Sequence, residues 1–150
     1  MSRTFFYILT TIFLFFFPAS YILSQAELTW EDLAEVKYVS VMDEDLGYAY
    51  MKAKYGQSLQ DQNGKEIVIE GYILPMDLES KQYALSAYPF SACFFCGGGG
   101  RESVIELWLA EPNQEFVLDD IVTFKGIFQL NDDQFGLNYI LKDAVQVKTK

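Results

Sequence analysis

Apolar and polar residues alternate along five segments from residue 65 onward, and this period of two is typical of β-strands with one buried face. In the first segment, Ile67, Ile69 and Ile73 fall on one face and Glu70 falls on the other. The five predicted strands span residues 65–74, 82–88, 103–109, 121–130 and 139–147.

Glycine and proline residues indicate how these strands are arranged. Asn63-Gly64 supplies a turn before the first strand, and Pro75 is expected to end that strand because proline cannot donate to a ladder. Gly71 and Gly126 lie within predicted strands, where glycine costs stability unless the strand bends sharply. We therefore predict an all-β fold with a short N-terminal helix, built on a five-stranded barrel like the OB-fold. A β-sandwich is the alternative.

The residues before the barrel carry weaker patterns. Thr29 is placed to cap a short helix, because acidic residues follow it and apolar residues such as Leu33 recur at helical spacing. Residues 38–42 alternate like a strand, and the acidic run 43–45 predicts a solvated turn. Residues 48–59 are ambiguous, but their tyrosines favour an extended arm that lies on the core.

The N-terminus has the order of a signal peptide. Arg3 is followed by an uncharged apolar run over residues 5–17, then by Pro18 and by the small-residue site Ser24-Gln25-Ala26. We expect cleavage after Ala26, which removes residues 1–26 as the leader.

Cleavage would leave residues 27–150 as a single domain, and the protein would be periplasmic or secreted. The alternative is a protein anchored in the membrane by an uncleaved helix over residues 5–23. With cleavage, the protein meets the membrane only transiently, through its leader.

Charge and composition exclude several classes of function. The chain carries 11 basic and 21 acidic residues, a net charge of −10, so nucleic acid would be repelled and is not an expected partner. Histidine is absent, so neither a Ser-His-Asp triad nor a Cys-His pair can be built. We therefore expect no enzymatic activity, no catalytic residues and no bound cofactor.

The most distinctive stretch spans residues 92–101, between the second and third predicted strands. It contains both cysteines of the chain, Cys93 and Cys96, followed by four consecutive glycines. Glycines after the second cysteine disfavour the helix that thioredoxin-type chemistry needs, and they stand where haem attachment would need histidine. The glycine run also lacks the spacing of a phosphate-binding loop. The simplest interpretation of the glycine run is a flexible hairpin tip.

Three states of the cysteine pair remain open. In an oxidising compartment the simplest is a disulfide between Cys93 and Cys96, worth about 2 kcal/mol because the closed loop is short. The second is a zinc site, for which Glu102, Glu106 or a second subunit would have to supply further ligands. The third is a pair of free, reactive thiols.

Three other residues of this loop are candidates for binding. Phe94 and Phe95 lie between the cysteines, where burial is not automatic, and exposed rings there would form an apolar recognition tip. Arg101 could hold a carboxylate, although the simpler interpretation is a solvated charge at the start of a strand. We expect both phenylalanines to point outward, toward a protein partner or a small ligand.

The first strand also carries a family resemblance. Its sequence, Gly64-Lys65-Glu66-Ile67-Val68-Ile69-Glu70-Gly71-Tyr72-Ile73-Leu74-Pro75, followed by a cysteine loop and a closing strand, resembles an uncharacterised domain-of-unknown-function family of exported bacterial proteins. The resemblance covers residues 30–147 and implies an OB-like barrel in the cell envelope. In that family the loop often contains histidine and prolines, whereas this chain has Cys96 and glycines there.

These observations leave two hypotheses from different classes. The first is a non-enzymatic exported envelope protein that binds a protein partner or a small ligand through the cysteine and glycine loop. The second is a metal-handling or thiol-redox accessory protein that uses Cys93 and Cys96 directly.

Overall fold

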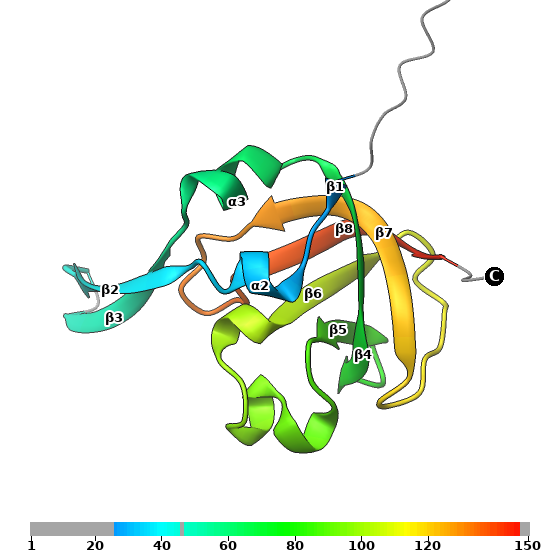
Figure 1. The fold of residues 1–150 in the computed structure, drawn as a ribbon. Coiled ribbons are helices and arrows are strands. Elements are labelled where there is room, and N and C mark those ends of the chain that lie inside the picture. The colour runs from blue at the N-terminus through cyan, green and yellow to red at the C-terminus, as the bar shows by residue number, and fades with distance from the viewer. Residues whose placement is uncertain (1–25, 46, 148–150) are drawn as a thin grey trace, which may run out of the picture.

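The computed structural model describes residues 26–45 and 47–147, and it contains a closed barrel of five strands (Figure 1). The barrel is formed by β4 (Glu66–Asp77), β5 (Gln82–Ser86), β6 (Val104–Leu109), β7 (Ile121–Leu130) and β8 (Tyr139–Val147). Neighbours pair in the order β4-β5-β6-β8-β7, and β7 pairs with β4 to close the ring. The β6–β8 contact is parallel and the other barrel pairings are antiparallel. The structure therefore confirms the predicted all-β, OB-like barrel.

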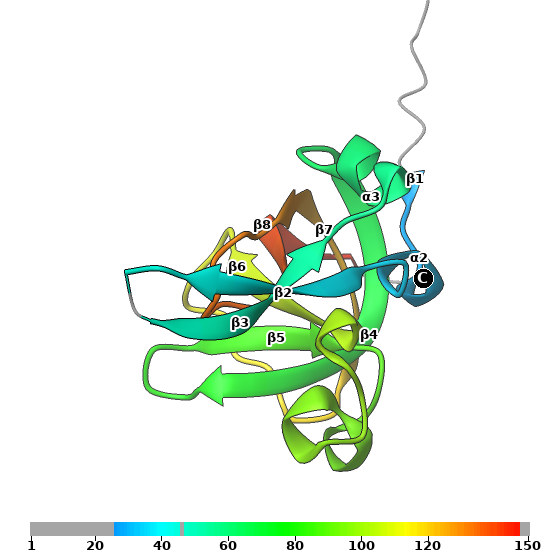
Figure 2. The same cartoon turned by 90° about the vertical axis from the view of Figure 1, so that its left-hand side faces the viewer.

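The strand β4 is long and curved, as Figure 2 shows, because it belongs to both sides of the barrel. Its first half pairs with β7 and its second half with β5, and the two ladders meet at Tyr72. Gly71 lies beside this point, and a Cβ atom there would approach the Ser86 carbonyl oxygen to 2.6 Å. Gly126 is equally close to the backbone of β8, at 2.6 Å from the Lys142 oxygen. Both glycines therefore occupy places where no larger residue fits.

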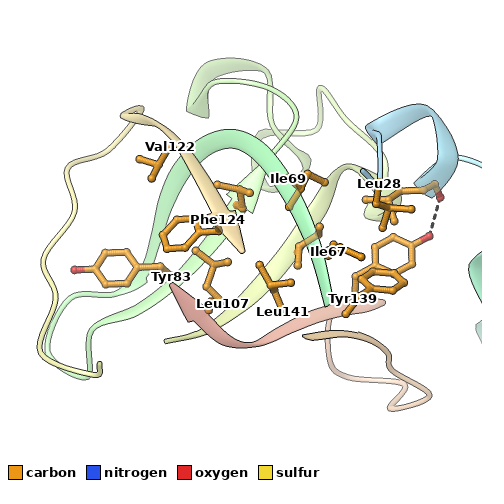
Figure 3. Packing of buried hydrophobic residues seen from close by; sticks show 14 of the residues in the cluster. Leu28, Ile67, Ile69, Tyr83, Leu107, Val122, Phe124, Tyr139 and Leu141 are labelled. Carbon is orange, nitrogen blue, oxygen red and sulfur yellow. Dashed lines mark hydrogen bonds between the residues drawn. The ribbon is translucent and has the colours of Figure 1, made fainter. Parts of the chain in front are cut away.

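The barrel interior is filled by the faces that the alternation predicts (Figure 3). Ile67 and Ile73 on β4 and Phe124 and Phe128 on β7 are completely buried. Tyr139 on β8 is also buried, and its hydroxyl donates to the Leu33 carbonyl at 2.7 Å. Burying these large side chains provides most of the apolar stabilisation of the fold.

The segment before the barrel covers one of its ends. β1 (Ala26–Glu27) pairs in parallel with β4, and α2 (Trp30–Leu33) and α3 (Gln57–Gln62) bury Leu33 and Leu59. Thr29 and Asp32 form a reciprocal capping box at the start of α2, as the sequence predicts for Thr29. Hydrogen bonds from Thr29 to the Asp32 carboxylate lower the pKa of that carboxyl.

A separate two-stranded ribbon projects from the barrel in Figure 1. It consists of β2 (Lys37–Asp43) and β3 (Tyr48–Lys54), which pair along their whole length. The expected extended arm over residues 48–59 is thus a strand followed by a helix, and most of it is held by β2 rather than by the core.

The ends of two barrel strands differ from the sequence-based expectation. Pro75 does not end β4, which continues to Asp77 through a register shift opposite β5. A bulge tolerates proline because the ladder is already interrupted there. β5 is shorter than predicted and ends at Ser86.

The predicted leader, residues 1–26, and the possible anchor over residues 5–23 fall almost entirely outside the described residues. Within residues 26–45 and 47–147, no helix is both long and apolar enough to cross a membrane.

Candidate functional site

The segment between β5 and β6 folds into three short 3-10 turns, Phe90–Ala92, Phe94–Cys96 and Arg101–Ser103. Gly97 ends the second turn in the left-handed conformation, with φ 78°. Gly98 then passes so close to Ala92 that any Cβ atom would collide with the Ala92 backbone, and its amide donates to the Cys93 carbonyl at 3.1 Å. The glycines therefore permit a tight chain reversal, and the loop is a series of 3-10 turns in place of a simple hairpin tip.

The two cysteines lie in different environments. Cys93 is completely buried in a small cluster on the outside of the barrel, together with Leu74, Ala84 and Val104. Cys96 is exposed, and both residues are free thiols in the structure. The structure therefore does not show the disulfide that the sequence predicts. Desolvation, followed by the hydrogen bond and charge interaction with Cys93, raises the pKa of the Cys96 thiol.

The raised pKa bears on the reactive-thiol hypothesis. The thiolate is the nucleophile and the metal ligand, and activated cysteines have a lowered pKa. The surroundings of the exposed Cys96 thiol therefore do not lower its pKa, as activation would require.

A zinc site also lacks ligands in the described part of the chain. Residues 26–45 and 47–147 contain no group of three or more histidine, cysteine, aspartate or glutamate side chains placed to hold a metal. Glu102 accepts a hydrogen bond from the Tyr38 hydroxyl at 3.3 Å, and Glu106 accepts one from Trp108 Nε1 at 2.8 Å. Within the described residues of one chain, the carboxylates proposed to complete a cysteine site are therefore engaged elsewhere and do not form a zinc site.

The phenylalanines between the cysteines point in different directions. Phe94 is half-buried and packs against the outer cluster, whereas Phe95 is 45% exposed. Their ring centroids are 5.2 Å apart in an edge-to-face arrangement. The expectation that both rings point outward is therefore wrong for Phe94, because its ring covers the buried Cys93 and its neighbours.

A cleft of about 470 Å³ lies beside this loop, over the outer face of β5 and β6. Its aromatic lining comes from four separate places: Tyr83 from β5, Phe94 and Phe95 from the cysteine loop, Trp108 from β6, and Phe135 from the loop between β7 and β8. In OB-folds this face, with the loops that flank it, is the usual ligand-binding surface. The volume falls in the range of small-molecule and peptide sites.

Trp108 is held in place by two polar neighbours. Its Nε1 donates to Glu106, and Lys142 Nζ lies 4.7 Å from its ring centroid in a cation–π contact. Trp108 is nevertheless 46% exposed. A fixed and exposed indole is a suitable platform for a ligand.

Phe135 was not a candidate in the sequence, although it is the most exposed large apolar side chain of the described residues, at 78%. It stands in a turn that is otherwise polar, after Asn131-Asp132-Asp133-Gln134. A single aromatic residue in such a turn is the signal that could have identified it.

Arg101 joins the two sides of the cleft. It starts the third 3-10 turn, and its Nη2 donates to the Gly136 carbonyl at 2.7 Å. The residue is half-buried, and its Nε is buried without a hydrogen-bond partner. The expected fully solvated charge is therefore wrong, because Arg101 is half-buried and its guanidinium donates a hydrogen bond to the β7–β8 loop.

The closed barrel, with its parallel β6–β8 contact and its cleft over β5 and β6, defines a protein of the OB-fold class. No family model matches the chain, and no curated protein matches it significantly. Its fold resembles the crystal structure of a DUF3299 family protein from Pseudomonas aeruginosa PAO1, with a TM-score of 0.52 and 19% sequence identity. The match covers 85% of this chain and 99% of that chain. This likeness supports the resemblance to an uncharacterised family and shows the barrel fold alone.

Proposed function

We propose that the protein is a non-enzymatic binding module of the cell envelope, which holds a protein partner or a small ligand in the cleft beside the cysteine loop. The observation that carries this proposal is the cleft itself. Aromatic side chains from four separate segments converge there, on the face that OB-folds use for binding.

The chemistry of the cleft favours recognition over catalysis. Exposed aromatic residues grouped in a concave site are typical of binding hot spots. The polar groups of the lining include Arg101, Lys81 and Glu106, and the chain has no histidine to act as a general base near neutral pH. This combination supports a site that holds its ligand unchanged.

An envelope location is part of the proposal and rests on the leader-like order of residues 1–26. The mature protein recovered from the periplasm or medium should begin at Glu27. Intact-mass measurement checks this, and a mass that includes residues 1–26 would favour the membrane-anchored alternative.

Binding of the neutral dye N-phenyl-1-naphthylamine tests the cleft without reference to any natural ligand. The dye should bind with one-to-one stoichiometry, seen as an increase in its fluorescence. Phe135→Ala and Trp108→Ala should each weaken binding by about tenfold, the effect of losing one aromatic contact.

Ile121→Ala is the matched control, because Ile121 is 62% exposed and lies on β7 outside the cleft. It should leave the affinity for the dye unchanged. Equal affinities for all three variants and the unaltered protein would exclude the cleft as the binding site.

A further inference from the structure

Arg101 has more hydrogen-bonding capacity than the protein uses. A guanidinium carries five N–H donors, and the described contacts of Arg101 fill one of them, through the Gly136 carbonyl. Its Nε is buried without a partner, and no carboxylate within the described residues lies at salt-bridge distance from it. A half-buried guanidinium without a counter-ion has N–H donors free for an anion that the chain itself does not supply.

The acidic residues near Arg101 are occupied elsewhere. Glu102 accepts from the Tyr38 hydroxyl, Asp132 pairs with Lys52 at 3.9 Å, and Asp133 accepts from the Phe135 amide. With 21 acidic residues in the chain, a carboxylate partner for Arg101 would be easy to provide. Within the described residues, Arg101 therefore has no carboxylate partner in a salt bridge.

Apolar side chains line the same cleft as the Arg101 guanidinium. Phe94, Phe95, Phe135 and Leu137 line the cleft together with Arg101. Two other charged residues line it: Lys81 is paired with Glu115 at 2.9 Å, and Glu106 accepts a hydrogen bond from Trp108 Nε1 at 2.8 Å. A ligand that satisfies the whole site therefore needs one anionic group for Arg101 and an apolar body for the rings.

We propose that the cleft accepts a carboxylate carried on an apolar body, with Arg101 as the carboxylate-binding residue. This inference rests on the proposed binding function and names its ligand class. A planar carboxylate matches the fork of N–H donors on a guanidinium, which binds it through parallel hydrogen bonds. Two sources supply this chemistry: the C-terminus of an apolar peptide and a free fatty acid.

Isothermal titration calorimetry with matched pairs of probes tests the proposal on the unaltered protein. The first pair is N-acetyl-Leu-Phe with a free C-terminal carboxylate and the same dipeptide as its amide. The second pair is decanoate and decanamide. At least one acid should bind about tenfold more tightly than its amide, and the pair that shows the difference identifies the source.

The variant Arg101→Gln should abolish the difference between acid and amide, because the amide side chain has no charge. Lys125→Gln is the control: Lys125 lies on β7, pairs with Glu66 at 3.5 Å and does not line the cleft. It should preserve the tenfold preference for the acid. The neutral dye should still bind Arg101→Gln, which shows that the cleft remains folded.

The outcomes separate this inference from the function on which it rests. If the neutral dye binds but acids and amides bind equally, or none of the four probes binds, the carboxylate proposal is overturned and the binding function stands. If the dye also fails to bind, both are overturned. Equal acid preference in Arg101→Gln and the unaltered protein would reject Arg101 as the anion-binding residue.

Discussion

The protein has two apolar clusters, one on each side of the barrel wall. The interior cluster draws on every barrel strand and is sealed by Leu33 and Leu59. The outer cluster contains Leu74, Ala84, Cys93 and Val104, with Phe94 and Leu137 packed against it. The interior cluster makes the fold, whereas the outer cluster fixes the loops that form the cleft. The two clusters meet at the cleft, because Tyr83 and Leu107 of the interior cluster also line it.

The largest expected effect is on the interior side of this comparison. Gly126→Val should lower the free energy of unfolding by about 3 kcal/mol, because the new side chain meets the Lys142 carbonyl at 2.6 Å and cannot move away from backbone. Urea denaturation measures this. Gly56→Ala is the control, since its Cβ would meet only an ordinary contact at 3.4 Å. An unchanged midpoint for Gly126→Val would mean that the barrel wall is looser than described.

The second prediction addresses the outer cluster. In reducing buffer, Cys93→Ser should destabilise the protein by about 2 kcal/mol, because a hydroxyl replaces a thiol that is buried among apolar side chains. Cys96→Ser should change stability by less than about 0.5 kcal/mol, since Cys96 is exposed. Equal losses from the two variants under these conditions would contradict the asymmetry of the pair.

The same two variants also test for a disulfide between Cys93 and Cys96. In an oxidising buffer, a Cys93–Cys96 bond would add about 2 kcal/mol to the loss of each variant, because each removes the cross-link. Titration of free thiols under denaturing, non-reducing conditions gives the direct answer. No free thiol is the result that the disulfide predicts, and two free thiols per chain would reject it.

The smallest expected effect concerns the junction between the ribbon and the β7–β8 loop. The Tyr55 hydroxyl donates to the carbonyls of Asn131 and Asn138, and burial is the main cause that raises the pKa of Tyr55 to about 12. The folded protein therefore holds this proton more tightly than the unfolded chain, whose tyrosines titrate near 10. Stability should fall as pH rises from about 10 to about 12.

Thermal unfolding at pH 9 and pH 11 checks this sign. Tyr55→Phe should lose about 1 kcal/mol at pH 9 through the missing hydrogen bonds and should show a smaller fall between the two pH values. Burial also raises the pKa of Tyr139, so part of the fall should remain in this variant. The same alkaline loss with and without Tyr55 would assign the whole effect to other groups.

The sequence predicts the interior of the barrel far better than its outer face. Strand alternation and internal glycines are local signals, so Ile67, Phe124 and Gly126 could be placed correctly from a few neighbouring residues. The burial of Cys93, in the loop after β5, depends on contacts with Leu74 on β4 and Val104 on β6. No local pattern encodes such contacts, and for the same reason the orientation of Phe94 was predicted incorrectly.

The cleft illustrates the same limit. Arg101 and Phe95 were candidates because they lie near the cysteines, but their shared site depends on Gly136 and Phe135 from a loop that follows β7. The site exists only after the barrel closes and brings the two loops together. Its chemistry could be read from the sequence in part, whereas its geometry could not.

Closure of the barrel through β4 and β7 also has a kinetic consequence. Glu66 pairs with Ile127, so the ladder between β4 and β7 joins residues that are far apart in the sequence. This ladder can form only after β7 has reached β4. Sheets dominated by such distant pairings fold slowly, on a scale of about milliseconds to seconds, because the entropy of loop closure is lost before the contacts form. During that interval β4 exposes an apolar edge that can pair with another chain. The protein is therefore most prone to aggregate while it folds, and it becomes resistant once β7 has covered that edge.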